Sequence, residues 1–230
     1  MFKYKENFWS FPAAFILTIM VLLFVNGCGA RKKTSEVAVG LEPDRQVELE
    51  PGQQRIADWH ALIREKRHVS EMEKLESVNS FFNQLEFVDD LAHWGRKDYW
   101  STPQEMLASN GGDCEDFATA KYFTLLQLDV PDDNMRLTYV KALQLKQPHM
   151  VLSYYPEPNA DPLILDSLIK RILSASERPD LIPVYSFNGK GLWLAKKQNS
   201  ERLGGAERLS LWQDLQTRFS REAVASPLPE

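Results

Sequence analysis

The sequence predicts an α+β domain in which N-terminal helices pack on a mostly antiparallel sheet. Much of residues 56–128 carries apolar side chains at the three- and four-residue spacing of helices. From residue 135 onward the pattern changes to the two-residue alternation of strands. The dipeptide Asn188-Gly189 lies between two apolar runs, which is a strong hairpin signal. A run of helices followed by a run of strands is typical of an α+β fold.

The first half of the domain contains three segments with helical character. Residues 56–68 and residues 71–85 each carry an apolar stripe at helical spacing. A third helix should begin within residues 101–105, because a hydroxyl side chain, then proline, then an acid is a frequent helix start. We expect it to end at Asn110-Gly111-Gly112, where glycine would supply the left-handed conformation of a helix terminus.

The second half is expected to consist of one buried helix, a series of strands and a closing helix. The buried helix should begin at Asp113-Cys114 and stop before Pro131. A helix near residues 206–219 closes the domain. Alternation and turn residues predict strands at residues 135–141, 150–155, 163–166, 184–187 and 191–195.

The first 30 residues have the plan of a secretory signal peptide or membrane anchor. Lys3 and Lys5 precede an uncharged apolar run at residues 11–25, and small residues follow it. Three outcomes stay open: a cleaved signal, an uncleaved anchor that tethers the protein to the membrane, and a lipoprotein anchored at Cys28. Each of them places the globular part outside the cytoplasm.

Composition and charge limit the classes of function. The chain has 230 residues and a net charge of −5, so nothing suggests nucleic-acid binding, which usually requires a basic excess. Residues 31–54 are polar and predict a linker ahead of a domain at residues 55–230. The cysteines are Cys28 and Cys114. A disulfide framework is therefore not expected, and Cys114 is either an inert core residue or a reactive thiol.

The motif Gly111-Gly112-Asp113-Cys114-Glu115-Asp116 favours the reactive thiol. Two glycines allow a tight turn, and the cysteine then falls in the first turn of a helix. There the free backbone N–H groups and the helix dipole favour the thiolate, which is the nucleophilic form. The same N–H groups could hold an oxyanion.

His149 and Asp166 are suited to complete a thiol–imidazole–carboxylate triad with this cysteine. His149 begins one expected strand and Asp166 ends the next, so both lie at one end of the hairpin if these strands pair. Each residue also has an ordinary structural interpretation, as a buried cysteine, a surface histidine or a turn aspartate. His93 is a weaker candidate for the base, whereas His60 and His68 lie on a charged helix face.

Several segments resemble the bacterial transglutaminase-like cysteine proteinases. The similarity covers most of residues 55–220 and is most specific around the cysteine. It implies a papain/transglutaminase-like core and a family triad at Cys114, His149 and Asp166. The segments that carry it are 94–95, 98–100, 111–116, 120–123, 136–143, 149–152, 165–166 and 184–188.

Three acidic residues crowd the cysteine, although negative charge beside a thiol disfavours the thiolate. Acids in the first turn of a helix can simply complement the helix dipole. Alternatively, a bound cation neutralises them, and oxygen ligands outside the cytoplasm favour Ca²⁺. Calcium dependence in the family implies that Asp113, Glu115 and Asp116 are calcium ligands.

The resemblance also implies a biological role. The protein would be a periplasmic endopeptidase that cuts the N-terminal region of a large RTX-like surface adhesin near a pair of alanines. Cleavage would release the adhesin and let cells leave a biofilm, under the control of an inhibitory LapD-like inner-membrane receptor that senses cyclic di-GMP. Two alternatives stay open: a transglutaminase that passes the acyl group to an amine, and a catalytically idle, calcium-dependent binding protein.

Overall fold

The computed structural model describes residues 49–195 and 200–225, so the expected leader and most of the expected linker lie outside the described residues. None of the helices in this part of the chain combines the length and the apolar character that crossing a bilayer requires. The helices are α1 (Pro51–Lys66), α2 (Glu71–Phe82), α3 (Asp90–His93), α4 (Pro103–Ser109), α5 (Cys114–Gln127) and α6 (Ser210–Ala225), with 3-10 turns η1 (Asp132–Asn134), η2 (Ala175–Glu177) and η3 (Ala206–Arg208). The strands are β1 (Glu86–Phe87), β2 (Gly111–Gly112), β3 (Met135–Ala142), β4 (Gln147–Tyr154), β5 (Leu163–Leu165), β6 (Leu173–Ser174), β7 (Leu181–Phe187), β8 (Leu192–Ala195) and β9 (Ser200–Gly204).

The first helix begins earlier than the sequence predicted. Pro51 occupies its first turn, where the fixed φ of proline suits a helix and its missing N–H costs nothing. Glu50 precedes it as the N-cap, and the side chain of Gln53 completes a reciprocal capping box with Glu50. Residues 51–54 therefore belong to the domain and not to the expected linker.

One antiparallel sheet carries the second half of the domain. Its strand order is β6-β5-β4-β3-β7-β8-β9, and every neighbouring pair is antiparallel. The predicted hairpin at Asn188-Gly189 is present between β7 and β8, and the predicted α+β class is confirmed. The short strands β6 and β9, at the two edges, were not predicted because they lack a clear alternation.

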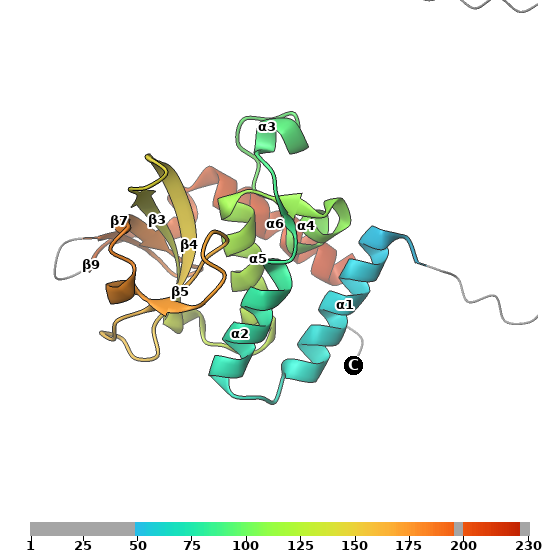
Figure 1. Ribbon diagram of the computed structural model, residues 1–230, viewed down its shortest axis with the longest axis horizontal. Coiled ribbons are helices and arrows are strands. Elements are labelled where there is room, and N and C mark those ends of the chain that lie inside the picture. The colour runs from blue at the N-terminus through green and yellow to red at the C-terminus, as the bar shows by residue number, and fades with distance from the viewer. Residues whose placement is uncertain (1–48, 196–199, 226–230) are drawn as a thin grey trace, which may run out of the picture. The chain divides into compact units, whose positions relative to one another are not determined.

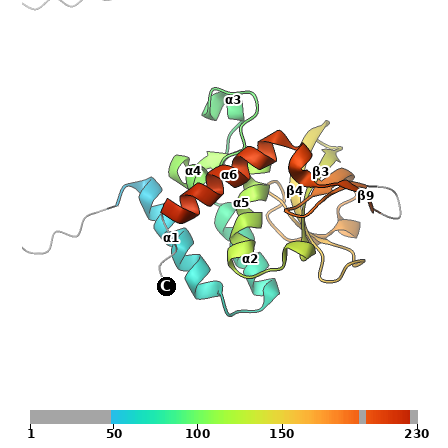
Figure 2. The same ribbon diagram turned by 180° about the vertical axis from the view of Figure 1, so that it is seen from behind.

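Helix α5 lies at the centre of the molecule. It packs against β3 and β4 on one side and against α2 and α4 on the other (Figure 1). Helix α6 crosses α4 and α5 on the face that Figure 2 brings forward. Ten consecutive residues of α5, 116–125, are buried. This helix is therefore fixed on all sides, which gives the residues at its N-terminus a rigid platform.

Aromatic side chains join α5, α6 and the sheet into one core. Trp212 of α6 is almost fully buried and stacks on Phe123 of α5, with 5.4 Å between the ring centroids. It also meets Tyr122 and Phe187 edge-on, at 5.6 Å and 5.3 Å. Truncating such a tryptophan to alanine costs about 3 to 5 kcal/mol of stability, so this cluster is a major anchor of α6.

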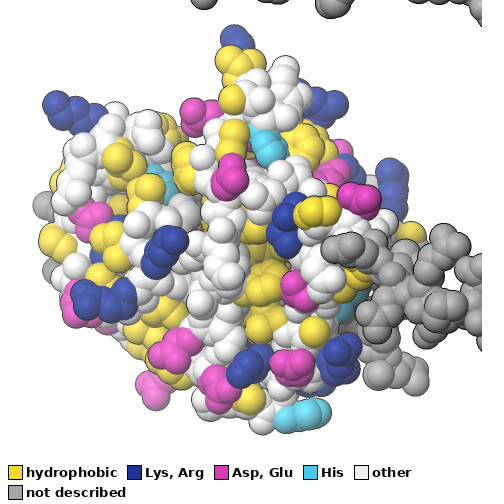
Figure 3. All heavy atoms as spheres, turned by 45° about the vertical axis from the view of Figure 1, so that its right-hand side comes forward, with side chains coloured by type: hydrophobic (Ala, Val, Ile, Leu, Met, Phe, Trp, Pro, Cys, Tyr) yellow, Lys and Arg dark blue, Asp and Glu magenta, His cyan; other side chains and the backbone are white. Residues whose placement is uncertain are grey.

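Charges are mixed over the surface. On the face shown in Figure 3, acidic and basic side chains are interspersed, and hydrophobic side chains gather along its middle. Phe87 and Leu91, near the N-terminal end of α5, are among the exposed large hydrophobic side chains. On that face neither sign of charge dominates, which agrees with the small net charge of the chain.

Candidate active site

The turn that leads into α5 is built by an asparagine and two closely packed glycines. Asn110 ends α4 in the left-handed conformation, with φ of 67°. The prediction that glycine supplies this conformation is therefore wrong; asparagine tolerates it because its side chain is short and polar. Gly111 and Gly112 instead form β2, which pairs in parallel with β1. A Cβ on Gly112 would lie 2.4 Å from the Asp116 carboxylate, so glycine is required there for space.

Two of the predicted acidic residues cap α5. Asp113 is the N-cap, and its backbone N–H donates to Asp116 Oδ2 at 3.2 Å. Asp116 is fully buried, and its Oδ1 accepts the backbone N–H of Ser101 at 2.6 Å. Burial raises the pKa of Asp116 to about 7, although the hydrogen bonds from Ser101 oppose this rise. The capping interactions place Cys114 at the first position of the helix.

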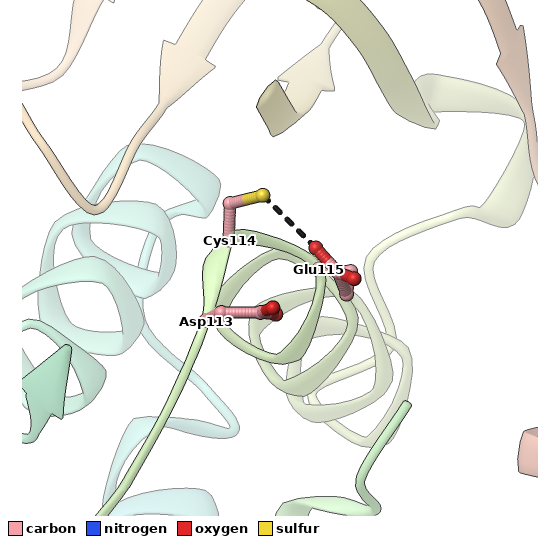
Figure 4. Close-up of side chains that lie close together, drawn as sticks. All are labelled: Asp113, Cys114 and Glu115. Carbon is pink, nitrogen blue, oxygen red and sulfur yellow. Dashed lines mark hydrogen bonds between the residues drawn. The ribbon is translucent and has the colours of Figure 1, made fainter. Parts of the chain in front are cut away.

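The thiol of Cys114 points at an acidic neighbour. Its Sγ donates to Glu115 Oε2 at 2.9 Å, and the Asp113 carboxylate lies beside this pair (Figure 4). Burial raises the pKa of the thiol far above its usual range, and the negative charges of Glu115 and Asp113 raise it further. A backbone N–H of Met150 acts in the opposite direction. This arrangement favours the protonated thiol over the nucleophilic thiolate.

His149 and Asp166 lie in direct contact. His149 Nε2 donates to Asp166 Oδ1 at 2.7 Å, and both side chains are almost completely buried. The hairpin expected from the sequence brings them together, because β4 and β5 pair with Leu152 opposite Leu165. The bond fixes the ring orientation and leaves Nδ1 as the nitrogen available to take up a proton.

Asp166 also contacts two basic residues that were not predicted to belong to the site. Its Oδ2 accepts Arg178 Nη2 at 2.8 Å, and its main-chain oxygen accepts Lys121 Nζ at 3.0 Å. Burial alone would raise the pKa of Asp166, but hydrogen bonds from His149 and then from the Leu168 N–H and Arg178 lower it to about 2. Asp166 is thus an ionised carboxylate at any physiological pH. Lys121 had a signal, as a charge within an apolar helix, whereas Arg178 had none.

Cys114 and His149 line one cleft of about 540 Å³ at the N-terminal end of α5. Its walls come from the start of α5, from β3, β4 and β7, and from the segment that leads into α6. Tyr139 and Tyr185, stacked with 5.0 Å between ring centroids, form part of one wall. Phe87 and Trp100 line it as well. Cys114 and His149 thus share one cleft with several aromatic side chains.

A cluster of carboxylates surrounds the acidic neighbour of the thiol. Ligand atoms of Asp90, Asp98 and Glu115 lie within 4.8 Å of one another, and so do those of Asp90, Asp113 and Asp116. Asp90 and Asp98 were not predicted, because they precede Glu115 by 25 and 17 residues and show no local ligand spacing. The fold brings these two residues to the predicted acids.

The cluster has the properties of a cation site. Asp90 Oδ1 and Asp113 Oδ1 are buried and have no hydrogen-bond partner. Burial, followed by the charge of Glu115, raises the pKa of Asp98 and Asp113, and burial raises that of Asp90 as well. Carboxylate oxygens are the hard ligands that Ca²⁺ prefers, and the two Oδ1 atoms face the other acids of the cluster without a donor of their own. The residues present therefore fit calcium.

The structure does not bring His93 to the thiol. It ends the short helix α3, its ring packs edge-on against Trp94 at 4.7 Å, and it does not line the cleft. Of the candidate bases, His149 is the one that shares the cleft with Cys114.

Comparison with known proteins identifies the family. Residues 55–198 match the family described as bacterial transglutaminase-like cysteine proteinase. The structure of Legionella pneumophila LapG is 47% identical, with a TM-score of 0.68, and the match covers 76% of this chain and 92% of that one. LapG treated with EGTA matches over the same shares, with 47% identity and a TM-score of 0.69. Calcium-bound LapG gives 47% identity, coverage of 75% and 93%, and a TM-score of 0.67. No curated protein matches the chain.

The chain belongs to the bacterial transglutaminase-like cysteine proteinases, because the family match spans more than half of it. The resemblance stated from the sequence is thereby confirmed. Membership makes the chain a cysteine peptidase with a transglutaminase-like fold.

Proposed function

We propose that this member of the family is a calcium-dependent cysteine endopeptidase with Cys114 as nucleophile, His149 as base and Asp166 as the acid that orients the base. The observation that carries the proposal is the buried bond of 2.7 Å between His149 and Asp166, beside a cleft that both His149 and Cys114 line. A helix-borne thiol beside an imidazole that a carboxylate orients is the arrangement that nucleophilic catalysis requires.

The reaction follows from the roles of these three residues. His149 Nδ1 takes the proton of the Cys114 thiol, and the thiolate attacks the carbonyl carbon of the scissile peptide bond. The resulting imidazolium is stabilised by Asp166 and gives its proton to the leaving amine as the C–N bond breaks. A thioester remains on Cys114. Water attacks it with His149 as base, which releases the acid product and restores the thiol. Backbone N–H groups at the start of α5 are placed to stabilise the oxyanion in both steps.

A bound calcium ion would offset the negative charge that surrounds the thiol. Asp90, Asp98, Asp113 and Glu115 would hold the ion through their carboxylate oxygens, with Asp116 beside them. When bound, Ca²⁺ supplies positive charge that cancels the electrostatic penalty on the thiolate. Glu115, engaged as a ligand, would no longer accept the thiol proton, so that proton becomes available to His149. LapG, which is 47% identical, has been solved both bound to calcium and after treatment with EGTA, which supports this part of the proposal.

We further propose, from the family resemblance, the setting in which this chemistry serves. The substrate is the N-terminal region of a large RTX-like surface adhesin, and the enzyme acts in the periplasm after export by its N-terminal leader. A LapD-like inner-membrane receptor for cyclic di-GMP would inhibit it by binding. The aromatic walls of the cleft support a peptide substrate.

The test uses the purified full chain and the N-terminal fragment of a large adhesin from the same genome. Both are incubated with calcium and with EGTA, beside a Cys114→Ala variant. We expect a single new N-terminus with calcium and the intact cysteine, and none with EGTA or with Cys114→Ala. A cut that persists in EGTA would contradict the proposed calcium dependence but would still support a cysteine peptidase.

The same incubations distinguish the alternatives. Incorporation of a labelled primary amine without a new N-terminus would point to a transglutaminase. A folded chain that neither cuts nor transfers, yet binds its partner equally well as Cys114→Ala, would point to a binding protein without catalysis.

A further inference from the structure

Behind the pair formed by His149 and Asp166 lies an arginine that none of the proposed chemistry uses. Arg178 follows η2, its side chain is 2% exposed, and it does not line the cleft that holds the thiol. Its Nη2 lies 2.8 Å from Asp166 Oδ2, on the side of the carboxylate away from His149. The contact with Asp166 is what links Arg178 to the pair.

The oxygen atoms of Asp166 divide their contacts in a definite way. Oδ1 accepts His149 Nε2 at 2.7 Å and the backbone N–H of Leu168 at 3.1 Å. Oδ2 accepts Arg178. A carboxylate rotates easily about its last side-chain bond, because that torsion is broad. The contact with Arg178 occupies Oδ2 and so keeps Oδ1 directed at the imidazole.

Arg178 is itself held in place by a second carboxylate. Its Nε and Nη2 donate to Asp180 Oδ1 and Oδ2 at 3.1 Å and 2.9 Å, a two-pronged contact that fixes the plane of the guanidinium. The loop is tied down as well: the Leu181 N–H donates to the Arg178 carbonyl, and the Leu143 N–H donates to the Asp180 carbonyl. The arginine thus transmits the position of this loop to Asp166.

The charges around Asp166 fit the imidazolium that the reaction forms. Asp166, Arg178 and Asp180 together carry one net negative charge, so protonation of His149 brings the group to neutrality. Lys121 of α5 is the remaining charged group at Asp166, and it contacts the main-chain oxygen rather than the carboxylate. Burial lowers the pKa of Lys121 to about 7, which weakens its positive charge at neutral pH.

We propose that Arg178, anchored by Asp180, is a positioning residue that holds the Asp166 carboxylate in the orientation that His149 needs. This inference rests on the proposed roles of His149 and Asp166. Because Arg178 lies outside the cleft, its loss should lower kcat and leave KM nearly unchanged. A misplacement of about 1 Å in a catalytic group costs up to about a hundredfold in rate.

The test compares Arg178→Gln, Arg178→Lys and Asp180→Asn in the full chain, with Lys74→Met as a control. Lys74 is also buried, but it donates to the main-chain oxygen of Leu128 at 2.7 Å, outside the group of contacts around Asp166. Two quantities are measured with saturating calcium. The first is kcat and KM on the adhesin fragment, and the second is the NMR signal of the His149 ring N–H in protein labelled with ¹⁵N-histidine.

We expect Arg178→Gln to lower kcat at least about tenfold, with KM within about twofold, and to shift or broaden the ring N–H signal of His149. Arg178→Lys and Asp180→Asn should give smaller changes of the same kind. Lys74→Met should lower stability and leave the signal in place.

Folded Arg178→Gln with wild-type kcat and an unchanged His149 signal would overturn the proposal. If Arg178→Gln does not fold, Arg178→Lys and Asp180→Asn are compared with the wild type instead. Wild-type kcat and an unchanged His149 signal in both would overturn the proposal. If the wild-type chain cuts no peptide, the proposed function fails, and the His149 signal still decides whether Arg178 positions Asp166.

Discussion

The two halves of the candidate active site are built on different principles. In the sheet half, His149 and Asp166, each carboxylate oxygen has a donor, and the pair is complete from protein atoms alone. In the helix half, Cys114 with Asp113 and Glu115, like charges crowd together and Asp113 Oδ1 has no hydrogen-bond partner. The sheet half is thus preorganised, whereas the helix half is completed by a cation in our proposal.

Shifts in pKa express the same difference. In the sheet half, hydrogen bonds to the charged form outweigh burial and lower the pKa of Asp166 to about 2. Around the helix half, burial and neighbouring acids raise the pKa values of Cys114 and Asp113, and that of Asp116 rises to about 7. Both environments are buried, so the partners, and not the burial, decide the sign. Activity and calcium binding should therefore be separable by mutation.

The largest expected effect comes from the sheet half. Asp166→Asn keeps the shape of the side chain but removes the charge that, in the proposed mechanism, orients and stabilises the imidazolium. We expect kcat at saturating calcium to fall roughly a thousandfold or more, as happens when the acid of such a triad is neutralised. The calcium affinity of Asp166→Asn should equal that of the wild type. A calcium titration with the unfolding temperature as its readout measures both affinities. A matching loss of calcium affinity would show that the two halves are not independent.

The second prediction concerns pH and stability. The pKa of Asp116 is about 7 in the folded state, above its unfolded value of 3.8. Its contribution to the free energy of unfolding is therefore fully present below about pH 4 and is lost as pH rises through 7. For Asp116 alone the loss approaches about 4 kcal/mol, and the raised pKa values of Asp90, Asp98 and Asp113 act in the same direction.

Asp166 acts oppositely, because its folded pKa is below its unfolded value. Its contribution to the free energy of unfolding is present above about pH 4 and is lost only as pH falls through 2. Metal-free protein should therefore be most stable near pH 4 and weaken toward pH 7, and saturating calcium should abolish that decline. Urea unfolding at several pH values, with and without calcium, measures both curves. A metal-free protein with equal stability at pH 4 and pH 7 would contradict the proposed electrostatics.

Third, a single carboxylate of the proposed cation site can be neutralised. Asp98→Asn should weaken calcium binding about tenfold, because one charged ligand becomes neutral. In chelator the same variant should unfold at a higher temperature than the wild type, because repulsion with Glu115 is relieved. Glu86→Gln is the matched control: its carboxylate is exposed and contacts Asn110 rather than the cluster. Equal effects of both substitutions would mean that overall charge, and not this cluster, governs calcium binding.

The smallest effect should come from the turn before the helix half. Asn110 is left-handed, so Asn110→Ala should cost about 1 kcal/mol, and Asn110→Gly should be neutral or slightly stabilising. Neither should change calcium affinity, since the turn supplies no ligand. Chemical denaturation and calcium titration check both points. A change in calcium affinity here would show that the cluster responds to backbone strain.

Local patterns along the chain determine much of the fold. Helical spacing and capping residues predict α1, α2, α4 and α5, because these signals involve neighbours a few residues apart. The same holds for the pairing of His149 with Asp166, since a hairpin brings together residues that are close in the chain. The error at Gly111-Gly112 also has a local cause: two residue types can adopt the left-handed conformation, and the required space near Asp116 is not visible in the sequence.

The sequence by itself determined the α+β class, the position of Cys114 at a helix start and the hairpin that brings His149 to Asp166. Only the tertiary structure decided that Asp90 and Asp98 join the acids beside the thiol, and that Arg178 supports Asp166 from behind. The physical reason is that carboxylates and guanidinium groups carry no periodic signal. Their role depends on which partners the fold places within a few ångströms, and those partners come from distant segments of the chain.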